Sequence, residues 1–375
     1  GNVRDKIIKL VLALDKTPGV EDLLSEVVTG DHGMTLHEQA PYGVVLAIYP
    51  ATNPCATMIN NVISMLAAGN SVISIPNPRC METSQFLTEK INEAIEEACG
   101  IQNLVVTLPE SRNDLLTEII NHPDVALVVA TGGRKMMSHV LCSPKRVIAG
   151  GPANPVAIVD ETADLAKAAK DISDGASFDN NIMCISEKCI VAVESIVPAF
   201  VKQLEENGVY YIDNETEMLQ LTKTVLNHDM KMVRKMEGKS AMDILEEAGI
   251  HPNRPVRLVV VRTFAKHPLV LEECLMPVVP LVAVADFEEA LETALFTEQG
   301  YRHTAMVHSQ CIDRLSKAAK IMNTTVFIKN GSSLAGIGLN GEEMASFTIA
   351  NVTGEGITTA RDFACKRSCT LTSGF

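Results

Sequence analysis

The sequence predicts an α/β protein made of two units, each a parallel sheet with helices on both faces. The first observation behind this prediction is length, because 375 residues are more than one core of ordinary size accommodates. The second is a repeated alternation of short apolar runs, rich in valine and isoleucine, with amphipathic helical runs. The third is the turn Gly150-Gly151-Pro152, which separates one such series from the next.

The first series of elements precedes that turn. Gly43–Tyr49 is a continuous apolar run, typical of a buried strand, and the helix expected over Thr57–Ala68 stops at Gly69. The series continues with strands at Ser71–Ile75, Leu104–Leu108 and Val125–Ala130, and with helices at Glu82–Cys99, Asp114–Asn121 and Arg134–Leu141. This β-α-β order favours a parallel sheet covered on both faces.

The second series follows the turn. Its strands are expected at Val156–Val159, Cys189–Val193, Arg257–Val261, Leu281–Val284, Thr304–His308 and Thr325–Ile328, and its helices at Leu165–Ser177, Phe287–Phe296 and Ile312–Met322. Two strands, Met34–Glu38 and Arg367–Leu371, stand outside both series. Lone strands at opposite ends of a chain often pair with each other or with another subunit.

We therefore expect a cofactor-binding domain over 1–152 with an arm strand near 33–40, a catalytic domain over 153–334, and a C-terminal segment over 335–375 that returns to the first domain. A homodimer or tetramer built through the lone strands is also expected.

Composition excludes several classes of protein. The net charge is −14 and no stretch rich in lysine and arginine is visible, which argues against binding to nucleic acid or to a membrane surface. No apolar run reaches the roughly 18 residues that a membrane helix requires. The ten cysteines are scattered without zinc-ligand spacing, so we expect no metal site and a reducing, cytoplasmic compartment.

Two polar side chains at strand edges indicate the chemistry. Cys184 lies in a polar turn before the strand Cys189–Val193, and Asn53 follows the strand Gly43–Tyr49. A thiol can attack an aldehyde carbonyl, and a carboxamide can hold the resulting oxyanion, so the pair predicts carbonyl oxidation through a thioester. The alternatives are a packing role for Cys184 and a helix-capping role for Asn53.

Two glycine motifs bear on cofactor binding. Gly132-Gly133 follows a predicted strand and precedes a predicted helix, where a phosphate can meet a helix N-terminus. Gly336–Gly341 matches the dinucleotide pattern GxGxxG, but a polar loop precedes it and no long helix clearly follows. We therefore expect Gly336–Gly341 to be a glycine-lined loop rather than a Rossmann fingerprint.

Taken together, these segments resemble the aldehyde dehydrogenase family, over essentially the whole chain. The carrying segments are Pro41–Val45, Pro50–Pro54, Leu66–Val72, Ala130–Gly133, Val159–Asp164, Phe178–Lys188, His303–Ser309 and Thr353–Arg361. Within the family the chain resembles the CoA-acylating branch, in particular the propionaldehyde and acetaldehyde dehydrogenases of bacterial microcompartments. The resemblance implies an aldehyde-dehydrogenase-like fold with a Rossmann-type cofactor domain, a catalytic domain and a short β arm for oligomerisation.

The resemblance also implies roles for single residues. Cys184 would be the nucleophile, and Asn53 with the Cys184 backbone N–H would hold the oxyanion. NAD would be bound by Glu273 at the nicotinamide ribose and by a set of residues after two strands: Thr131, Gly132, Gly133, Pro76 and Asn77. Asn77 departs from the histidine common in relatives, which leaves the choice between NAD and NADP open. His303 and His308 are expected to be core residues, although one of them could assist the CoA thiol.

Ala149 points to the acyl acceptor. Hydrolytic family members carry a general-base glutamate at about this place, before the Gly-Gly turn, whereas this chain has a methyl group. Water requires such a base, but a thiol with a pKa of about 8.5 ionises far more readily, so coenzyme A is the expected acceptor. Two alternatives stay open: a hydrolytic NAD-dependent enzyme, and an inactive structural component of a microcompartment. The resemblance further implies a place inside a microcompartment, with shell and cargo proteins contacted through a segment that usually precedes Gly1.

Overall fold

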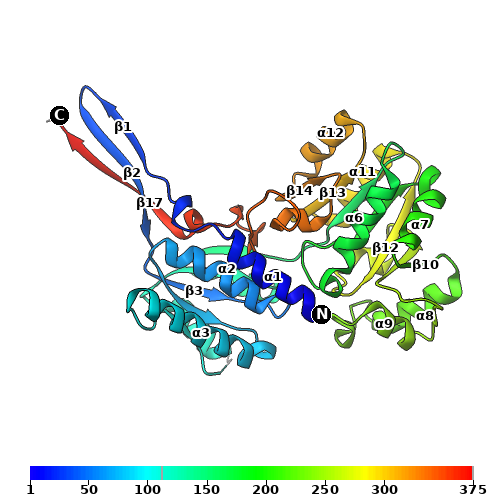
Figure 1. Ribbon diagram of the computed structural model, residues 1–375, viewed down its shortest axis with the longest axis horizontal. Helices are drawn as coiled ribbons and strands as arrows, with labels where there is room; N and C mark the ends of the chain where they lie inside the picture. The colour runs from blue at the N-terminus through cyan, green and yellow to red at the C-terminus, as the bar shows by residue number, and fades with distance from the viewer. Residues whose placement is uncertain (111–112, 374–375) are drawn as a thin grey trace. The chain divides into compact units, whose positions relative to one another are not determined.

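The computed structural model describes residues 1–110 and 113–373, and it divides into two compact units (Figure 1). The unit that carries Cys184, called here the cysteine unit, comprises Gly1–Ile8 and Pro152–Glu343. The other, called the arm unit, comprises Lys9–Gly151 and the chain from Met344 onward. The return to the arm unit therefore begins at Met344, later than position 335, because the segment after Ser333 packs on strands of the cysteine unit.

The arm unit contains a five-stranded parallel sheet. Its strands, in the order β5-β4-β3-β6-β7, are β5 (Val105–Thr107), β4 (Ser71–Ile75), β3 (Val44–Ile48), β6 (Val125–Thr131) and β7 (Arg146–Gly150). Its helices are α2 (Pro54–Ala67), α3 (Met81–Cys99), α4 (Asn113–Asn121) and α5 (Arg134–Leu141). One apolar cluster joins the sheet to α2 and α3, and a second joins it to α4 and α5. Helices therefore cover both faces, as the alternating pattern predicts.

β3 is the strand at which the order of the sheet reverses. The chain runs from β3 outward to β4 and β5, and then returns to the other side of β3 with β6 and β7. Ile48 at the end of β3 pairs with Ile75 on one side and with Ala130 on the other. In open α/β sheets, ligands bind beyond the carboxyl ends of the strands at such a reversal.

A separate antiparallel sheet forms the arm. Its strands are β1 (Glu26–Gly30), β2 (Gly33–Pro41) and β17 (Ala364–Thr372), in the order β1-β2-β17. β17 follows β2 along its whole length, from the pair Ala364–Pro41 to the pair Thr372–Gly33, and Figure 1 shows the two strands side by side. The two lone strands therefore pair with each other, as one of the predicted alternatives states. A short two-stranded ladder, β15 (Ile349–Ala350) with β16 (Gly356–Ile357), completes this unit.

The cysteine unit contains a seven-stranded parallel sheet in the order β10-β11-β12-β9-β8-β13-β14. The strands are β8 (Val156–Val159), β9 (Cys189–Val193), β10 (Val209–Ile212), β11 (Leu258–Thr263), β12 (Val278–Val284), β13 (Thr304–His308) and β14 (Val326–Lys329). The helices are α6 (Leu165–Ser177), α7 (Val197–Glu206), α8 (Glu215–Val225), α9 (Ala241–Glu247), α10 (Pro268–Leu271), α11 (Phe287–Glu298) and α12 (Ile312–Met322). Helix α1 (Val3–Lys16) begins in this unit and continues in the arm unit. No helix among the described residues is long and apolar enough to cross a membrane.

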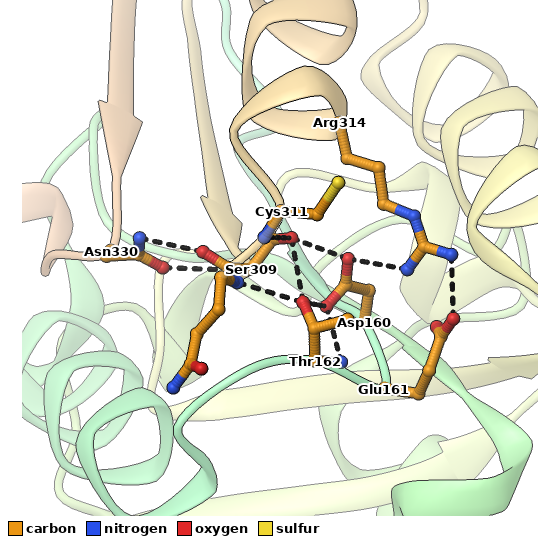
Figure 2. A network of polar contacts seen from close by, with 8 residues as sticks. Asp160, Glu161, Thr162, Ser309, Cys311, Arg314 and Asn330 are labelled. Atoms are coloured by element: carbon orange, nitrogen blue, oxygen red, sulfur yellow. Dashed lines mark hydrogen bonds and ion pairs between the residues drawn. The ribbon is translucent and has the colours of Figure 1, made fainter.

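A buried polar network joins the carboxyl ends of β8, β13 and β14 (Figure 2). The Asp160 carboxylate accepts hydrogen bonds from Thr162 N at 2.8 Å, Thr162 Oγ1 at 2.7 Å, Ser309 Oγ at 2.6 Å and Arg314 Nη1 at 2.9 Å. Asn330 closes the network, since its side chain bonds both the N–H and the C=O of Ser309 at 2.9 Å. The Asp160 carboxylate is thus surrounded by donors, which is typical of a structural role.

The segment Gly336–Gly341 serves packing. It follows β14 through a loop and a short 3-10 helix (Ser333–Ile337), and no α-helix follows it in residues 342–373. A Cβ atom at Gly336 would lie 2.4 Å from Val326, and one at Gly341 would lie 2.8 Å from the Ala335 carbonyl oxygen. These close approaches explain Gly336 and Gly341, and Gly338 has a positive φ of 85° that favours glycine. The prediction that this run is not a Rossmann fingerprint is confirmed.

Candidate active site

Cys184 lies in a loop whose backbone is strained. Three consecutive residues before it, Asp179, Asn180 and Asn181, have positive φ angles of 46°, 54° and 59°. A positive φ destabilises a non-glycine residue by on the order of 1 kcal/mol, and such a conformation is retained only where surrounding contacts hold the chain in place. The loop that follows places Cys184 in a turn between α6 and β9, with its side chain half-buried.

Helix α1 supplies contacts that hold the first strained residue. Asp179 is fully buried, and its carboxylate accepts hydrogen bonds from Asn2 N at 2.6 Å and from Lys6 Nζ at 3.0 Å. Its own N–H donates to Asp5 Oδ2 at 2.9 Å. Asn180 is held separately, because its Nδ2 donates to the Gly238 carbonyl at 2.9 Å. The strained turn is therefore fixed by side chains rather than by regular backbone pairing.

Lys188 closes the base of the same loop. Its side chain is buried, and its Nζ donates to the Asn181 carbonyl oxygen at 2.6 Å and also to Asn181 Oδ1. The Asn181 Nδ2 group in turn donates to the carbonyl oxygens of Ala176 at 2.7 Å and Glu187 at 3.0 Å. These bonds join the start and the end of the segment 181–188, so Cys184 lies on a closed and rigid loop.

Glu187 is a fully buried carboxyl group below this loop. It accepts hydrogen bonds from the N–H of Ser333 at 2.9 Å and from its hydroxyl at 2.8 Å. Gly175 on α6 leaves room for it, because a Cβ atom there would lie 2.2 Å from Glu187 Oε2. Burial raises the pKa of Glu187 to about 7, although Ser333 and the Lys188 charge oppose the rise. The group therefore titrates near neutral pH.

The electrostatic surroundings of Cys184 favour the thiol in this state. Burial, together with the negative charge of Glu273, raises its pKa to about 12. The Lys188 ammonium and the N–H groups of Cys184 and Ile185 act in the opposite direction. Glu273 lies in the loop between α10 and β12 and is half-buried, so its effect on the Cys184 pKa places it near the nucleophile rather than as a remote surface charge.

Lys188 is the centre of a coupled group of ionisable side chains. Burial lowers its pKa to about 8, and the negative charge of Glu273 opposes that change. His303 also faces this charge: burial and the Lys188 charge together lower its pKa to about 3, and its Nδ1 shares a hydrogen bond with Thr304 Oγ1 at 2.8 Å. Both His303 and His308 are buried on β13 or next to it, which agrees with the core role expected for them.

Asn53 in the arm unit begins α2 without capping it. Its backbone carbonyl accepts the first helical hydrogen bond, from Thr57 N at 3.1 Å, but its side chain makes no capping hydrogen bond. The Asn53 Oδ1 atom instead accepts a hydrogen bond from Nζ of Lys9, a buried residue of α1. The capping alternative considered from the sequence is therefore wrong, because the amide oxygen is bonded to Lys9 instead.

The predicted cofactor residues follow two neighbouring strands. Thr131 ends β6, where its hydroxyl shares a hydrogen bond with Thr348 Oγ1 at 2.9 Å. Gly132 and Gly133 then lead into α5, and a Cβ atom at Gly133 would meet no atom within 4 Å. Pro76 and Asn77 follow β4, and the Asn77 side chain accepts from Arg79 N at 3.1 Å, which caps a short 3-10 helix.

Within each unit the structure brings the predicted residues together. Asn53, the pair Pro76-Asn77 and Thr131 all follow the carboxyl ends of adjacent strands β3, β4 and β6, while Glu273 lies near Cys184 in the cysteine unit. The sequence analysis did not identify Lys9, Glu187 or Lys188, whose charged side chains are buried beside the predicted residues. For the last two a signal existed, since two charged residues directly precede a strand of five apolar residues.

Comparison with known proteins agrees with this arrangement. The profile of the aldehyde dehydrogenase family matches residues 13–338. A CoA-propanoylating propanal dehydrogenase from Salmonella typhimurium is 46% identical over 100% of this chain and 81% of its own length. An acetylating acetaldehyde dehydrogenase from the same organism is 41% identical, again over 100% of this chain and 81% of its own length.

Solved structures agree as well. An engineered glycolyl-CoA reductase with bound NADP+ is 43% identical, with a TM-score of 0.97 over 99% of this chain and 84% of its own. A Rhodopseudomonas palustris propionaldehyde dehydrogenase with bound CoA and an acylated cysteine is 42% identical, with a TM-score of 0.97 over 99% and 85%. A propionaldehyde dehydrogenase from the fucose utilisation microcompartment of Clostridium phytofermentans is 40% identical, with a TM-score of 0.98 over 100% and 86%. The chain therefore belongs to the aldehyde dehydrogenase family.

Proposed function

We propose that this chain is a CoA-acylating aldehyde dehydrogenase, which oxidises propionaldehyde or acetaldehyde with NAD+ and coenzyme A to acyl-CoA and NADH. The observation that carries the proposal is the Cys184 loop, in which a half-buried thiol is held on a strained turn closed by Lys188. Similarity over the whole chain to enzymes named as CoA-propanoylating and acetylating supports the same reaction.

The arm unit fits a dinucleotide. The order of its sheet reverses at β3, and the backbone after β6 leads through Gly132 and Gly133 into the N-terminus of α5. The space that a Cβ at Gly133 would enter is open, so a phosphate can approach the backbone there. NAD+, when bound, supplies the hydride acceptor. We propose Thr131, Gly132, Gly133, Pro76 and Asn77 as its contacts in this unit, and Glu273 as the residue that holds its nicotinamide ribose.

The chain's own residues perform the first chemical step. The Cys184 sulfur attacks the aldehyde carbon as the thiolate, and because burial keeps the thiol protonated at neutral pH, its proton must first pass to solvent water at the half-buried side chain. The Lys188 ammonium and the N–H groups of Cys184 and Ile185 stabilise the thiolate that forms. The Cys184 N–H and the Asn53 amide are the proposed donors to the oxyanion, and loss of one such donor typically reduces kcat by about 10²–10³. Loss of hydride then leaves an acyl thioester on Cys184.

Coenzyme A is the proposed acyl acceptor because no base for water stands at Ala149. The Ala149 side chain is buried in β7, and its backbone N–H donates to Thr353 Oγ1 at 2.9 Å. Glu187 is a carboxyl group with a pKa of about 7, but it is fully buried and both of its oxygens are bonded to Ser333. A thiol acceptor does not require such a base to the same degree.

NADH formation from propionaldehyde and NAD+, with and without CoA, tests the proposal. Sustained turnover only with CoA is expected, and a Cys184→Ala variant should lose essentially all of it while keeping its thermal unfolding temperature. Equal turnover without CoA would establish the hydrolytic alternative. Absence of turnover in a folded chain would favour the structural alternative, and residual activity in Cys184→Ala would remove Cys184 as the nucleophile. Substituting NADP+ and acetaldehyde in the same assay decides the preferred cofactor and chain length.

Oligomeric state and location are proposed more broadly. The arm presents β1, in which every residue is exposed, including Val27 and Val28. We propose that a dimer or tetramer forms through the arm, which light scattering tests, since a monomer would contradict it.

A place in the cytoplasm within a microcompartment, with shell or cargo proteins as partners, is supported by the relative from the fucose utilisation microcompartment. Co-purification with intact microcompartments tests that location.

A further inference from the structure

Helix α1 buries a charged residue and exposes apolar ones. The Lys9 side chain is only 2% exposed, whereas Ile7, Val11 and Leu14 on the same helix are 55%, 50% and 60% exposed. Burying an ammonium group is unfavourable unless hydrogen bonds replace its hydration. The position of Lys9 therefore calls for a partner whose interaction compensates for burial.

A partner of Lys9 is the amide that the proposed chemistry requires. Lys9 Nζ donates to Asn53 Oδ1, and both residues belong to the arm unit. An ammonium group has only donors, so the bond assigns the oxygen of the amide to the Lys9 side and directs Nδ2 elsewhere. In residues 1–110 and 113–373, Asn53 Nδ2 donates to no protein acceptor, and the side chain does not cap α2. Its two N–H groups are thus oriented without being used internally.

The charge on Lys9 also affects the strength of those donors. Hydrogen bonds from a charged donor are about twice as strong as neutral ones, which limits rotation of the amide. Electron density drawn toward Oδ1 leaves the nitrogen of the same conjugated group more positive, and hydrogen bonds in series strengthen one another in this way. Lys9 therefore both orients the Asn53 amide and makes its N–H groups better donors.

We propose that Lys9 is a positioning residue that orients and polarises the Asn53 amide for donation to the oxyanion formed from the aldehyde. The proposal rests on the proposed function, in which Asn53 is such a donor. It adds a residue from the first helix to the machinery and gives a reason for an ammonium group where helix α1 would otherwise bury an apolar side chain.

A double-mutant cycle tests this role. Lys9→Met, Asn53→Ala and the double variant are compared in the first turnover of NADH formation from propionaldehyde without CoA, which reports the steps up to the thioester. Lys9→Met is expected to slow this turnover by on the order of tenfold to a hundredfold, with a smaller change in the aldehyde concentration for half-maximal rate. In the Asn53→Ala background the same substitution should have little further effect, because its target is absent. Lys16→Met, on the exposed last turn of the same helix, is the matched control and should match the wild type.

A merely structural Lys9 would behave differently. Losses that multiply in the double variant, or a lowered unfolding temperature with an unchanged first turnover, would overturn the proposal. Lys9→Gln retains a donor without charge and should recover part of the rate. If Lys9→Met fails to fold, the cycle is repeated with Lys9→Gln.

A second readout does not depend on activity. The side-chain N–H resonances of Asn53, assigned by their loss in Asn53→Ala, should shift in Lys9→Met and stay in place in Lys16→Met. Unchanged resonances would overturn the proposal even in a chain that lacks turnover. A wild-type chain without turnover, but with shifted resonances, would contradict the proposed function and keep the positioning contact.

Discussion

Asp160 and Glu187 are two fully buried carboxyl groups in the same unit, and their pKa values are shifted in opposite directions. Burial raises the pKa of Asp160, but hydrogen bonds from Ser309, Thr162 and Arg314 outweigh that effect, and its pKa lies below the usual value. Glu187 accepts from one residue, Ser333, and burial raises its pKa to about 7. The number of donors, the presence of an arginine and the greater depth at which Glu187 lies together decide which group stays ionised.

The difference separates a structural network from a reactive one. The Asp160 network ties three strand ends with paired groups and lies among residues with no proposed chemistry (Figure 2). The Glu187 carboxyl adjoins Lys188 and the Cys184 loop, where pKa values are displaced toward neutrality or away from the charged form. Displaced pKa values are typical of active sites, because protonation states there must change during the reaction.

Asp160→Asn is expected to destabilise the protein by disrupting the Asp160 network. The substitution leaves Arg314 with Glu161 as its charged partner but removes the buried one, and it should lower the free energy of unfolding by about 3 kcal/mol, at the low end for a broken buried ion pair. The low end applies because the Arg314 side chain remains 29% exposed and can be hydrated. Thermal unfolding measures the effect. The control Glu161→Gln removes the other partner of Arg314, which is 39% exposed, and should change stability by less than about 1 kcal/mol. Equal losses of stability in Asp160→Asn and Glu161→Gln would contradict the structural role assigned to the buried Asp160 carboxylate.

Glu187→Gln is expected to change the pH dependence of stability, because the buried Glu187 carboxyl has a raised pKa. The folded pKa of about 7 lies above the value of 4.5 for a free glutamate, so the folded state binds the extra proton between these limits. Stability from this group is therefore present below pH 4.5 and is lost as the pH rises to 7. At pH 8 the variant should be more stable than the wild type by about 1–3 kcal/mol, and the gap should narrow to less than about 1 kcal/mol at pH 5. Unfolding temperatures at both pH values measure it, and a gap independent of pH would show that Glu187 does not titrate in this range.

The fold was largely predictable because its strands and helices have strong periodicity. The predicted helix Leu165–Ser177 and strand Cys189–Val193 coincide with α6 and β9. The sequence analysis did not predict the strands β1, β7, β10, β15 and β16 or the helices α1 and α7–α10. β1 is wholly exposed, so it has no alternation of buried and exposed residues, and β7 is short with Arg146 at one end and Gly150 at the other.

The site was predictable only where chemistry marks a residue type. Cys184 and Asn53 could be proposed because a thiol and an amide at strand edges suggest a reaction. Lys9 and Lys188 could not, because a lysine is expected at the surface and its burial depends on contacts made in the fold. Lys9 meets Asn53 across 44 residues of sequence, and only tertiary structure brings such a pair together.

Two substitutions near Cys184 should change the reactivity of its thiol in opposite directions, which tests the charges around the reactive loop. Glu273 raises the pKa of Cys184 and Lys188 lowers it, so Glu273→Gln should lower the thiol pKa and Lys188→Met should raise it. At pH 8 alkylation by iodoacetamide requires the thiolate, so the rate at Cys184 should rise in the first variant and fall in the second, each by roughly threefold to tenfold. Subtracting the reaction of the Cys184→Ala variant removes the contribution of the other cysteines. Changes in the same direction would mean that the two substitutions act through the shape of the loop, since a purely electrostatic effect must change sign with the charge removed.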